Sequence, residues 1–392
     1  IYQQTAPDVG DFLQHMDASQ WDDRQLKDWL RKSINIRLDL RTGPVAHGFL
    51  FTRAVNDHYF VWATHHIVVD YWSMVIWIEE LMSLYMLEEA GVECDAGHAE
   101  ATFAQAADWQ TRLIASPSGQ AMRDYWRKEL NDAPDLLSTL PLRRESPEAG
   151  HSVSYAGNAA RFVLDQDLSG QLRTLAEKQQ TTLFTVLMSA YQILLAEVSG
   201  LMDICVGTPT ACRGKPEFES LVGCMANMVV LRTKIEPNQT FAELVKVVQA
   251  KVWRALEAQE FPISRLVGDI KPECMGESRT FFRAAMTLEK SHRSDLQGLT
   301  NYLMEGTQRR IEVGSLAIET IDMDVGQTDI SARWELDLTM EEVDQQLVGS
   351  WFYNSDLFND STIRDFIAKF RRILNQIVLN PQLTILQLLH RF

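Results

Sequence analysis

The stretch Tyr59–Met74, YFVWATHHIVVDYWSM, places two adjacent histidines and an aspartate inside a mostly apolar run. The residues before the histidines are aromatic and β-branched with few charges, which is typical of a buried strand. Beyond the aspartate, Ser73 is predicted to cap a helix whose apolar positions recur at helical spacing and whose end is marked by Gly91. A strand that turns directly into a helix commonly carries functional groups on a rigid scaffold.

The two histidines of this stretch, His65 and His66, are expected to point in opposite directions. Successive residues of a strand face opposite sides of the sheet, so only one of the two serves a given cavity. An imidazole with an unperturbed pKa of about 6.5 takes or holds a proton near neutral pH, and burial or a nearby carboxylate shifts that pKa. A lone histidine in such a run is more often a hydrogen-bonded core residue, but the doublet followed by Asp70 favours a functional site.

Residues His65, His66 and Asp70 resemble the HHxxxD part of the HHxxxDG motif of condensation domains. These are the peptide-bond-forming domains of nonribosomal peptide synthetases, within the chloramphenicol-acetyltransferase-like acyltransferase superfamily. The resemblance implies that His66 faces the reaction centre, where it accepts the proton of the attacking amine or positions that amine, and that His65 supports the motif. Asp70 would be structural and paired with an arginine. The chain departs from the motif at Tyr71, which stands in place of the glycine.

Two further stretches resemble the same family. The run TLFTVLMSAYQILL…DICVGTPTACR, which ends at Arg213, is similar to the fourth core motif of the family, and Val222–Asn227 is similar to its VGxFVN motif. The resemblance implies that Arg213 is the partner of Asp70, whereas the alternative from residue type alone is an exposed, unpaired arginine. The substrate-binding positions that we expect are Tyr71, Trp72 and Asn227.

The length of 392 residues exceeds one usual domain core and favours two lobes. The segment Leu140–His151, with two prolines and mixed charges, is interpreted as the linker between them. By resemblance we expect an α/β fold (an α+β sandwich) of two chloramphenicol-acetyltransferase-like lobes, 1–145 and 152–392, in a V-shaped pseudo-dimer with the active site at the junction. The first lobe carries HHxxxD and lacks the strand–helix segment that usually precedes it. Because the sequence begins at Ile1 and not at a methionine, we expect a domain excised from, or acting within, a multidomain synthetase.

Other segments have clear secondary-structure patterns. Ile36–Leu40, Ala46–Arg53 and Glu312–Ile321 are predicted strands. Thr181–Ser199 is a predicted helix ended by Gly200. This helix is the most apolar segment of the chain, but the polar side chains within it indicate a core helix and not a membrane span.

Composition narrows the class of function. Hydrophobic residues make up 46% of the chain and charged residues 23%, as in soluble globular proteins. The formal net charge of −16 argues against nucleic acid and anionic membranes as partners. The five cysteines form no CxxC pair and no metal-ligand spacing with histidine, so we expect reduced thiols, no metal and a cytoplasmic location.

The resemblance implies an acyltransferase that joins a donor acyl or peptidyl thioester on one carrier protein to the amine of an acceptor on another. Such amide formation would belong to nonribosomal peptide or hybrid polyketide–peptide synthesis, in natural-product and antibiotic pathways. Both substrates would arrive on the 4′-phosphopantetheine arms of donor and acceptor carrier domains, with no bound cofactor and a monomeric domain. Two alternatives stay open: an ester-forming or dehydrating variant that uses a hydroxyl, and a catalytically silent domain that only binds carrier domains.

Overall fold

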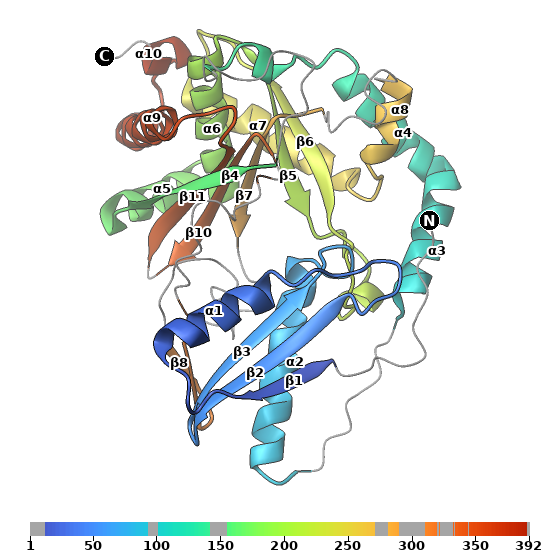
Figure 1. Ribbon diagram of the computed structural model, residues 1–392. Coiled ribbons are helices and arrows are strands. Elements are labelled where there is room, and N and C mark those ends of the chain that lie inside the picture. Colours follow the sequence, from blue (N-terminus) through green and yellow to red (C-terminus); the bar gives the residue numbers. More distant parts are fainter. Residues whose placement is uncertain are drawn as a thin grey trace. The chain divides into compact units, whose positions relative to one another are not determined.

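The computed structural model describes residues 12–92, 101–141, 155–270, 281–289, 310–319, 321, 332, 334–343 and 345–389 (Figure 1). Internal contacts divide the chain into two compact units. Unit 1 comprises Ile1–Gln105, Arg213–Met225 and Ser291–Val325, and unit 2 comprises Ala106–Cys212, Ala226–Lys290 and Gly326–Phe392. The predicted linker from residue 142 onward lies outside the described residues, so the boundary between lobes stays a prediction.

Unit 1 contains a three-stranded sheet in the order β1–β2–β3. Strand β1 (Leu13–Asp17) runs parallel to β2 (Ala46–Ala54), and β2 is antiparallel to β3 (Asp57–Thr64). One face of the sheet, with Phe49 and Phe51, packs against α1 (Asp23–Ile34). The capping box of Asp22 and Gln25 fixes the start of this helix.

The opposite face of this sheet contacts α2 (Tyr71–Glu89). Side chains alternate along a strand, so Phe60 and Trp62 of β3 point away from the α1 side. Both rings meet Trp77 of α2, with centroid separations of 5.9 and 3.6 Å. The predicted strand before the histidines is therefore confirmed. Aromatic rings fill the contact between this strand and α2.

Two of the predicted strands are wrong. Ile36–Leu40 is not a strand and leads into a turn. In this turn the Asp39 carboxylate accepts a hydrogen bond from the nitrogen of Arg41, and its carbonyl oxygen accepts one from the nitrogen of Gly43, both at 2.8 Å. Glu312–Ile321 is part of a hairpin instead of one strand. The hairpin joins β8 (Arg310–Val313) to β9 (Leu316–Glu319), and it turns at Gly314, whose φ of +59° suits glycine.

Unit 2 is built on a six-stranded mixed sheet in the order β4–β11–β10–β7–β5–β6. Neighbouring strands are antiparallel except that β7 is parallel to both β10 and β5. The strands are β4 (Gly157–Leu164), β5 (Asp203–Thr210), β6 (Asn227–Lys234), β7 (Ala284–Glu289), β10 (Leu336–Val343) and β11 (Gln346–Asn354). The helices from 103 onward are α3 (Phe103–Ala115), α4 (Pro117–Leu130), α5 (Gln166–Lys178), α6 (Leu183–Ser199), α7 (Phe241–Glu257), α8 (Ser264–Ile270), α9 (Asp360–Leu379) and α10 (Ile385–Leu389).

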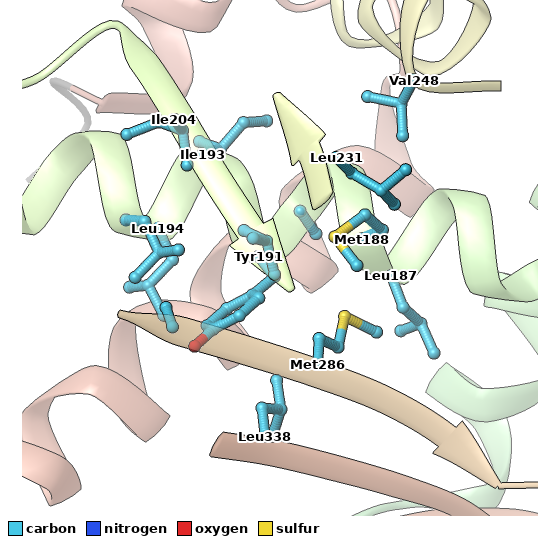
Figure 2. Packing of buried hydrophobic residues seen from close by; sticks show 14 of the residues in the cluster. Leu187, Met188, Tyr191, Ile193, Leu194, Ile204, Leu231, Val248, Met286 and Leu338 are labelled. Carbon is cyan, nitrogen blue, oxygen red and sulfur yellow. The ribbon is translucent and has the colours of Figure 1, made fainter. Parts of the chain in front are cut away.

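Helix α6 is the centre of the core of unit 2. It contacts α5, α7 and α9 as well as β5, and Figure 2 shows Tyr191 and Leu194 of α6 lying near Met286 and Leu338 of the sheet. The predicted core helix and its end at Gly200, which has a φ of +74°, are confirmed. Within the described residues no single helix is long and apolar enough to cross a membrane, and α5 with α6 meets that test only as a pair bent by 106°. Two mixed sheets with packed helices confirm the predicted α/β class.

Candidate active site

The predicted site lies in the turn between β3 and α2 of unit 1. β3 ends at Thr64 and α2 begins at Tyr71. The backbone nitrogen of His65 donates to the carbonyl of Val45 at 2.9 Å, and that of Val68 donates to the carbonyl of His65 at 3.1 Å. The first bond ties the turn to the residue that precedes β2, and the second closes the turn itself, so together they restrict the backbone that carries both histidines.

The imidazole of His66 has a defined tautomer. Its Nδ1 lies 2.7 Å from the carbonyl oxygen of Val69, and the side chain is exposed. Because a carbonyl oxygen only accepts hydrogen bonds, Nδ1 must carry the hydrogen. In the neutral ring Nε2 therefore has no hydrogen and presents a lone pair, which is the form that a proton acceptor needs.

His65 has the opposite arrangement. Its Nδ1 accepts a hydrogen bond from the backbone nitrogen of Ile67 at 3.1 Å, so the hydrogen of the neutral ring sits on Nε2. The bond stabilises the turn that carries His66. The geometry thus separates a histidine that braces the turn from one that offers a basic nitrogen.

Asp70 caps α2, and the prediction that Ser73 does so is wrong. The carboxylate Oδ1 of Asp70 accepts from the backbone nitrogen of Ser73 at 2.9 Å, which satisfies one of the free donors at the helix start. Aspartate and serine are both common caps, so residue type alone did not separate them. Ser73 is instead the third residue of the helix.

Asp70 and Arg213 form a buried two-pronged ion pair. Arg213 Nη1 lies 2.9 Å from Asp70 Oδ2, and Nη2 lies 3.1 Å from Oδ1. The two side chains are 3% and 1% exposed. The structure therefore brings together the two residues that the resemblance paired, and both belong to unit 1.

Further hydrogen bonds determine the protonation of Asp70. Its Oδ2 accepts from the backbone nitrogen of Met225 at 2.9 Å, and its Oδ1 also accepts from the hydroxyl of Ser73 at 2.7 Å. Burial raises the pKa of Asp70, but the hydrogen bonds and charge of Arg213, together with Ser73, outweigh it and hold the pKa below its ordinary value. Asp70 is therefore ionised at neutral pH and acts as an acceptor of hydrogen bonds, not as a base.

Ser73 and Gly223 extend this network, and sequence reasoning missed both contacts. The Ser73 hydroxyl lies 2.9 Å from the nitrogen and 2.9 Å from the carbonyl oxygen of Gly223. Gly223 packs under the ring of Phe103, where an added Cβ would lie 2.4 Å from a ring carbon. The available signal was a small hydroxyl residue three positions after the aspartate, at the start of a helix.

Trp72 fastens the same segment from another side. Its Nε1 donates to the carbonyl of Glu219 at 2.8 Å, and its ring lies 5.7 Å from the guanidinium carbon of Arg213. Tyr71, the first residue of α2, is half-buried beside it. Trp72 therefore contributes to holding Arg213–Met225 on α2, and contact of Tyr71 and Trp72 with substrate stays a prediction.

Asn227 belongs to unit 2, at the start of β6. Its amide nitrogen donates to the carbonyl oxygens of Gln259 at 2.7 Å and of Phe261 at 2.9 Å. Both amide hydrogens thus join β6 to the segment that follows α7. A role for Asn227 in binding substrate stays a prediction.

Cys224 lies beside His66, a neighbour that the sequence did not indicate. Its Sγ is 3.9 Å from His66 Nδ1. Burial raises the pKa of the Cys224 thiol, and the charge of Asp70 raises it further. The thiol also faces the nitrogen that already carries a hydrogen, so the pair is not a thiolate activated by histidine. Among the described residues, no group of three His, Cys, Asp or Glu side chains is placed to hold a metal ion.

Comparison with known proteins identifies the family. Residues 11–390 match the family model of the condensation domain. The chain is 29% identical over 343 residues to a linear gramicidin synthase protein of Brevibacillus parabrevis, and this match covers 88% of the chain but 4% of that protein. It is 27% identical over 389 residues to phosphinothricin tripeptide synthetase PhsC of Streptomyces viridochromogenes, which covers 95% of the chain and 34% of that protein.

The fold is also that of known synthetase domains. The crystal structure of holo-AB3403, a four-domain nonribosomal peptide synthetase, aligns with a TM-score of 0.81 at 21% identity, over 97% of this chain and 28% of that one. The first condensation domain of the calcium-dependent antibiotic synthetase aligns with a TM-score of 0.70 at 17% identity, over 98% and 81%. The family match spans nearly the whole chain and includes the turn that carries His66. The chain is a member of the condensation domain family of nonribosomal peptide synthetases.

Proposed function

We propose that this domain is an amide-forming acyltransferase in which His66 handles the proton of the attacking amine. One observation carries the proposal: the bond from His66 Nδ1 to Val69 leaves the lone pair of Nε2 on an exposed ring, away from the network that holds the turn. A buried or doubly bonded imidazole would have no such nitrogen to offer. The family of the chain supports the same reaction.

The reaction needs little beyond proximity and a proton acceptor. The acceptor's amine nitrogen attacks the carbonyl carbon of the donor thioester, the carbon–sulfur bond breaks, and the sulfur leaves as a thiol after taking up a proton. An α-amine with a pKa of about 7.7–8.0 is partly neutral at pH 7 and already nucleophilic. Holding amine and thioester together supplies much of the rate enhancement. Nε2 of His66 then orients the amine or accepts its proton as the bond forms.

The other site residues act on the position of His66. His65 braces the turn through Ile67, and the ionised Asp70 joins the start of α2 to Arg213. Asp70 and Arg213 are 3% and 1% exposed, and we assign both a structural role without contact to substrate. Tyr71, Trp72 and Asn227 are the residues that we assign to substrate binding.

Both substrates are proposed to arrive on 4′-phosphopantetheine arms of a donor and an acceptor carrier domain. The relatives are synthetases of which this chain spans a small part, which fits a domain that works, as a monomeric unit, within a larger assembly line. The chemistry requires no resident metal or cofactor. The formal net charge of −16 is consistent with protein partners and unfavourable for nucleic acid.

The test is intact-mass measurement of an acceptor carrier after mixing with a loaded donor carrier. We expect the acceptor to gain the mass of the donor acyl group when it carries an amino acid, and His66→Ala to slow this by about 10²–10⁴-fold while the protein stays folded. His58→Ala is the control, since His58 is an exposed histidine of β3, the strand that precedes the turn with His66. Gain of mass only with a hydroxy-acid acceptor would indicate ester formation, and no gain with either acceptor would indicate a silent domain.

A further inference from the structure

The hydroxyl of Ser73 is the meeting point of the buried network behind His66. The side chain is fully buried. Its Oγ accepts from Arg213 Nη2 and from the nitrogen of Gly223, both at 2.9 Å, and its hydrogen points to Asp70 Oδ1 at 2.7 Å or to the carbonyl of Gly223 at 2.9 Å. One small hydroxyl thus joins the ion pair to a peptide far away in the sequence.

The consequence of these bonds is that Cys224 is fixed on both sides. Gly223 before it is held by Ser73, and the nitrogen of Met225 after it donates to Asp70 Oδ2 at 2.9 Å. The nitrogen of Met225 also lies 3.0 Å from the carbonyl of Gly223, which tightens the tripeptide. The backbone of Cys224 therefore has little freedom to move relative to α2.

Cys224 in turn lies against the ring of His66. Its Sγ is 3.9 Å from Nδ1, and the carbonyl oxygen of Val69 is 2.7 Å from the same atom. Sulfur of a neutral thiol is a weak acceptor, so both neighbours of Nδ1 favour a hydrogen there. If Cys224 moved away, the ring would keep one partner and gain freedom to rotate about its side-chain torsions.

We propose that Ser73 is a positioning residue for His66, which it orients through Gly223 and Cys224. The consequence for catalysis rests on the proposed function, because it assumes that Nε2 handles the proton of the amine. The consequence for the ring does not rest on it. A merely structural Ser73 would stabilise unit 1 without any effect on the tautomer or orientation of His66.

The first measurement follows the imidazole directly and needs no substrate. Selective ¹⁵N labelling of histidine in the full chain, with the His66 signal assigned by His66→Gln, reports which ring nitrogen carries the hydrogen. We expect the Nδ1-protonated form in the parent. In Ser73→Ala the ring, no longer held by Cys224, should rotate away from the Val69 carbonyl part of the time, so we expect a mixture that includes the Nε2-protonated form. Cys224→Ala should shift the His66 signal in the same direction, and it tests the same path if Ser73→Ala fails to fold.

The second measurement separates positioning from stability. Ser169→Ala is the matched control, because Ser169 is a fully buried serine in the first turn of α5 whose hydroxyl accepts from the nitrogen of Leu347 at 2.9 Å. Both serine variants should lower the melting temperature. Only Ser73→Ala should lower kcat, by about 10–100-fold as expected for a misplaced group, with KM for the loaded carriers unchanged. Combining Ser73→Ala with Cys224→Ala should add little to the loss in kcat.

The outcomes distinguish the two proposals. An unchanged His66 signal in Ser73→Ala, or in Cys224→Ala where the serine variant does not fold, overturns the positioning role whatever the activity. Where the amide-forming rate does depend on His66, equal kcat in Ser73→Ala and Ser169→Ala also overturns it. A shifted His66 signal in a protein whose amide-forming rate does not depend on His66 would uphold the role of Ser73 and refute the proposed function.

Discussion

Asp70 and Arg213 are 143 residues apart in the sequence, but their side chains meet in a two-pronged ion pair with nitrogen–oxygen distances of 2.9 and 3.1 Å. The pair joins the first turn of α2 to the segment Arg213–Met225, so the turn that carries His66 is anchored by a distant part of the chain. A pair this deeply buried is maintained because either charge alone would be costly in the same place.

Either single change at this pair is expected to destabilise the protein strongly. Asp70→Ala and Arg213→Ala should each lower the free energy of unfolding by about 3–5 kcal/mol, since each leaves a buried charge without its partner. Asp70→Ala should be the more severe, because it also removes the helix cap, worth about 1 kcal/mol. Chemical denaturation of both variants gives these values.

The double variant Asp70→Ala/Arg213→Ala should cost less than the sum of the single changes by about 1–3 kcal/mol. The matched control is the exposed ion pair of α3 in which Arg112 Nη2 lies 2.9 Å from Asp108 Oδ2. The coupling energy of this pair should be below about 0.5 kcal/mol. Strict additivity at Asp70 and Arg213 would show that the two groups do not interact in solution.

The depressed pKa of Asp70 predicts a pH dependence of stability. The pKa of Asp70 in the folded state lies below its unfolded value of about 3.9. The ionised carboxylate therefore stabilises the folded state fully at pH values above about 3.9, and this stabilisation is lost as the pH falls through the folded pKa. The difference in unfolding free energy between the parent and Asp70→Asn should therefore be constant from about pH 7 to 5 and shrink only below about pH 4. A difference that already declines between pH 7 and 5 would contradict the assignment.

Much of the fold could be predicted from local patterns, and the failures have physical causes. The core helix α6 and its end at Gly200 followed from an apolar run and a glycine at the position of positive φ. Leu13–Asp17 carries no strand pattern of its own, and it becomes β1 by pairing in parallel with β2. A parallel partner distant in sequence cannot be read from the segment itself.

The site was predictable as a set of residue types but not as a network. The motif pointed to His66, Asp70 and Arg213, which the structure groups in unit 1. It gave no indication that Ser73 contacts Gly223 or that Cys224 lies beside His66, because these contacts depend on how a distant segment folds back onto α2. Tertiary contacts of this kind leave no periodic signal in a single sequence.

The close approach of Gly223 to Phe103 gives a further prediction. A Cβ at residue 223 would lie 2.4 Å from a carbon of the Phe103 ring, so Gly223→Ala should destabilise the protein by about 1–3 kcal/mol through overpacking. Phe103→Leu should partly restore stability in the double variant. Gly170→Ala in α5 is the control: apart from its chain neighbours and the backbone of its own helix, nothing lies within 4 Å of the added Cβ, and the change should stabilise the protein by about 0.5–1 kcal/mol. Equal melting temperatures for Gly223→Ala and Gly170→Ala would contradict the predicted crowding at residue 223.

The tyrosine in place of the motif's glycine is expected to affect the choice of substrate. Tyr71 is the first residue of α2, next to the capping Asp70 and five positions after His66, and its side chain is half-buried. The first helical position tolerates many residues because its backbone nitrogen has no partner within the helix, so Tyr71→Gly should keep the fold. A ring that narrows the substrate path would be removed by this change.

We therefore expect Tyr71→Gly to accept a wider range of donor acyl groups and acceptor amino acids than the parent, with the largest gains for bulky groups. The measurement is a competition in which small and bulky loaded carriers are offered together and the products are separated by intact mass. Tyr71→Phe is the matched control, since it keeps the ring and its volume and should preserve the parent's selectivity. If Tyr71→Gly gives the same ratio of products as the parent, the Tyr71 ring only packs against its neighbours and does not set the substrate range of this domain.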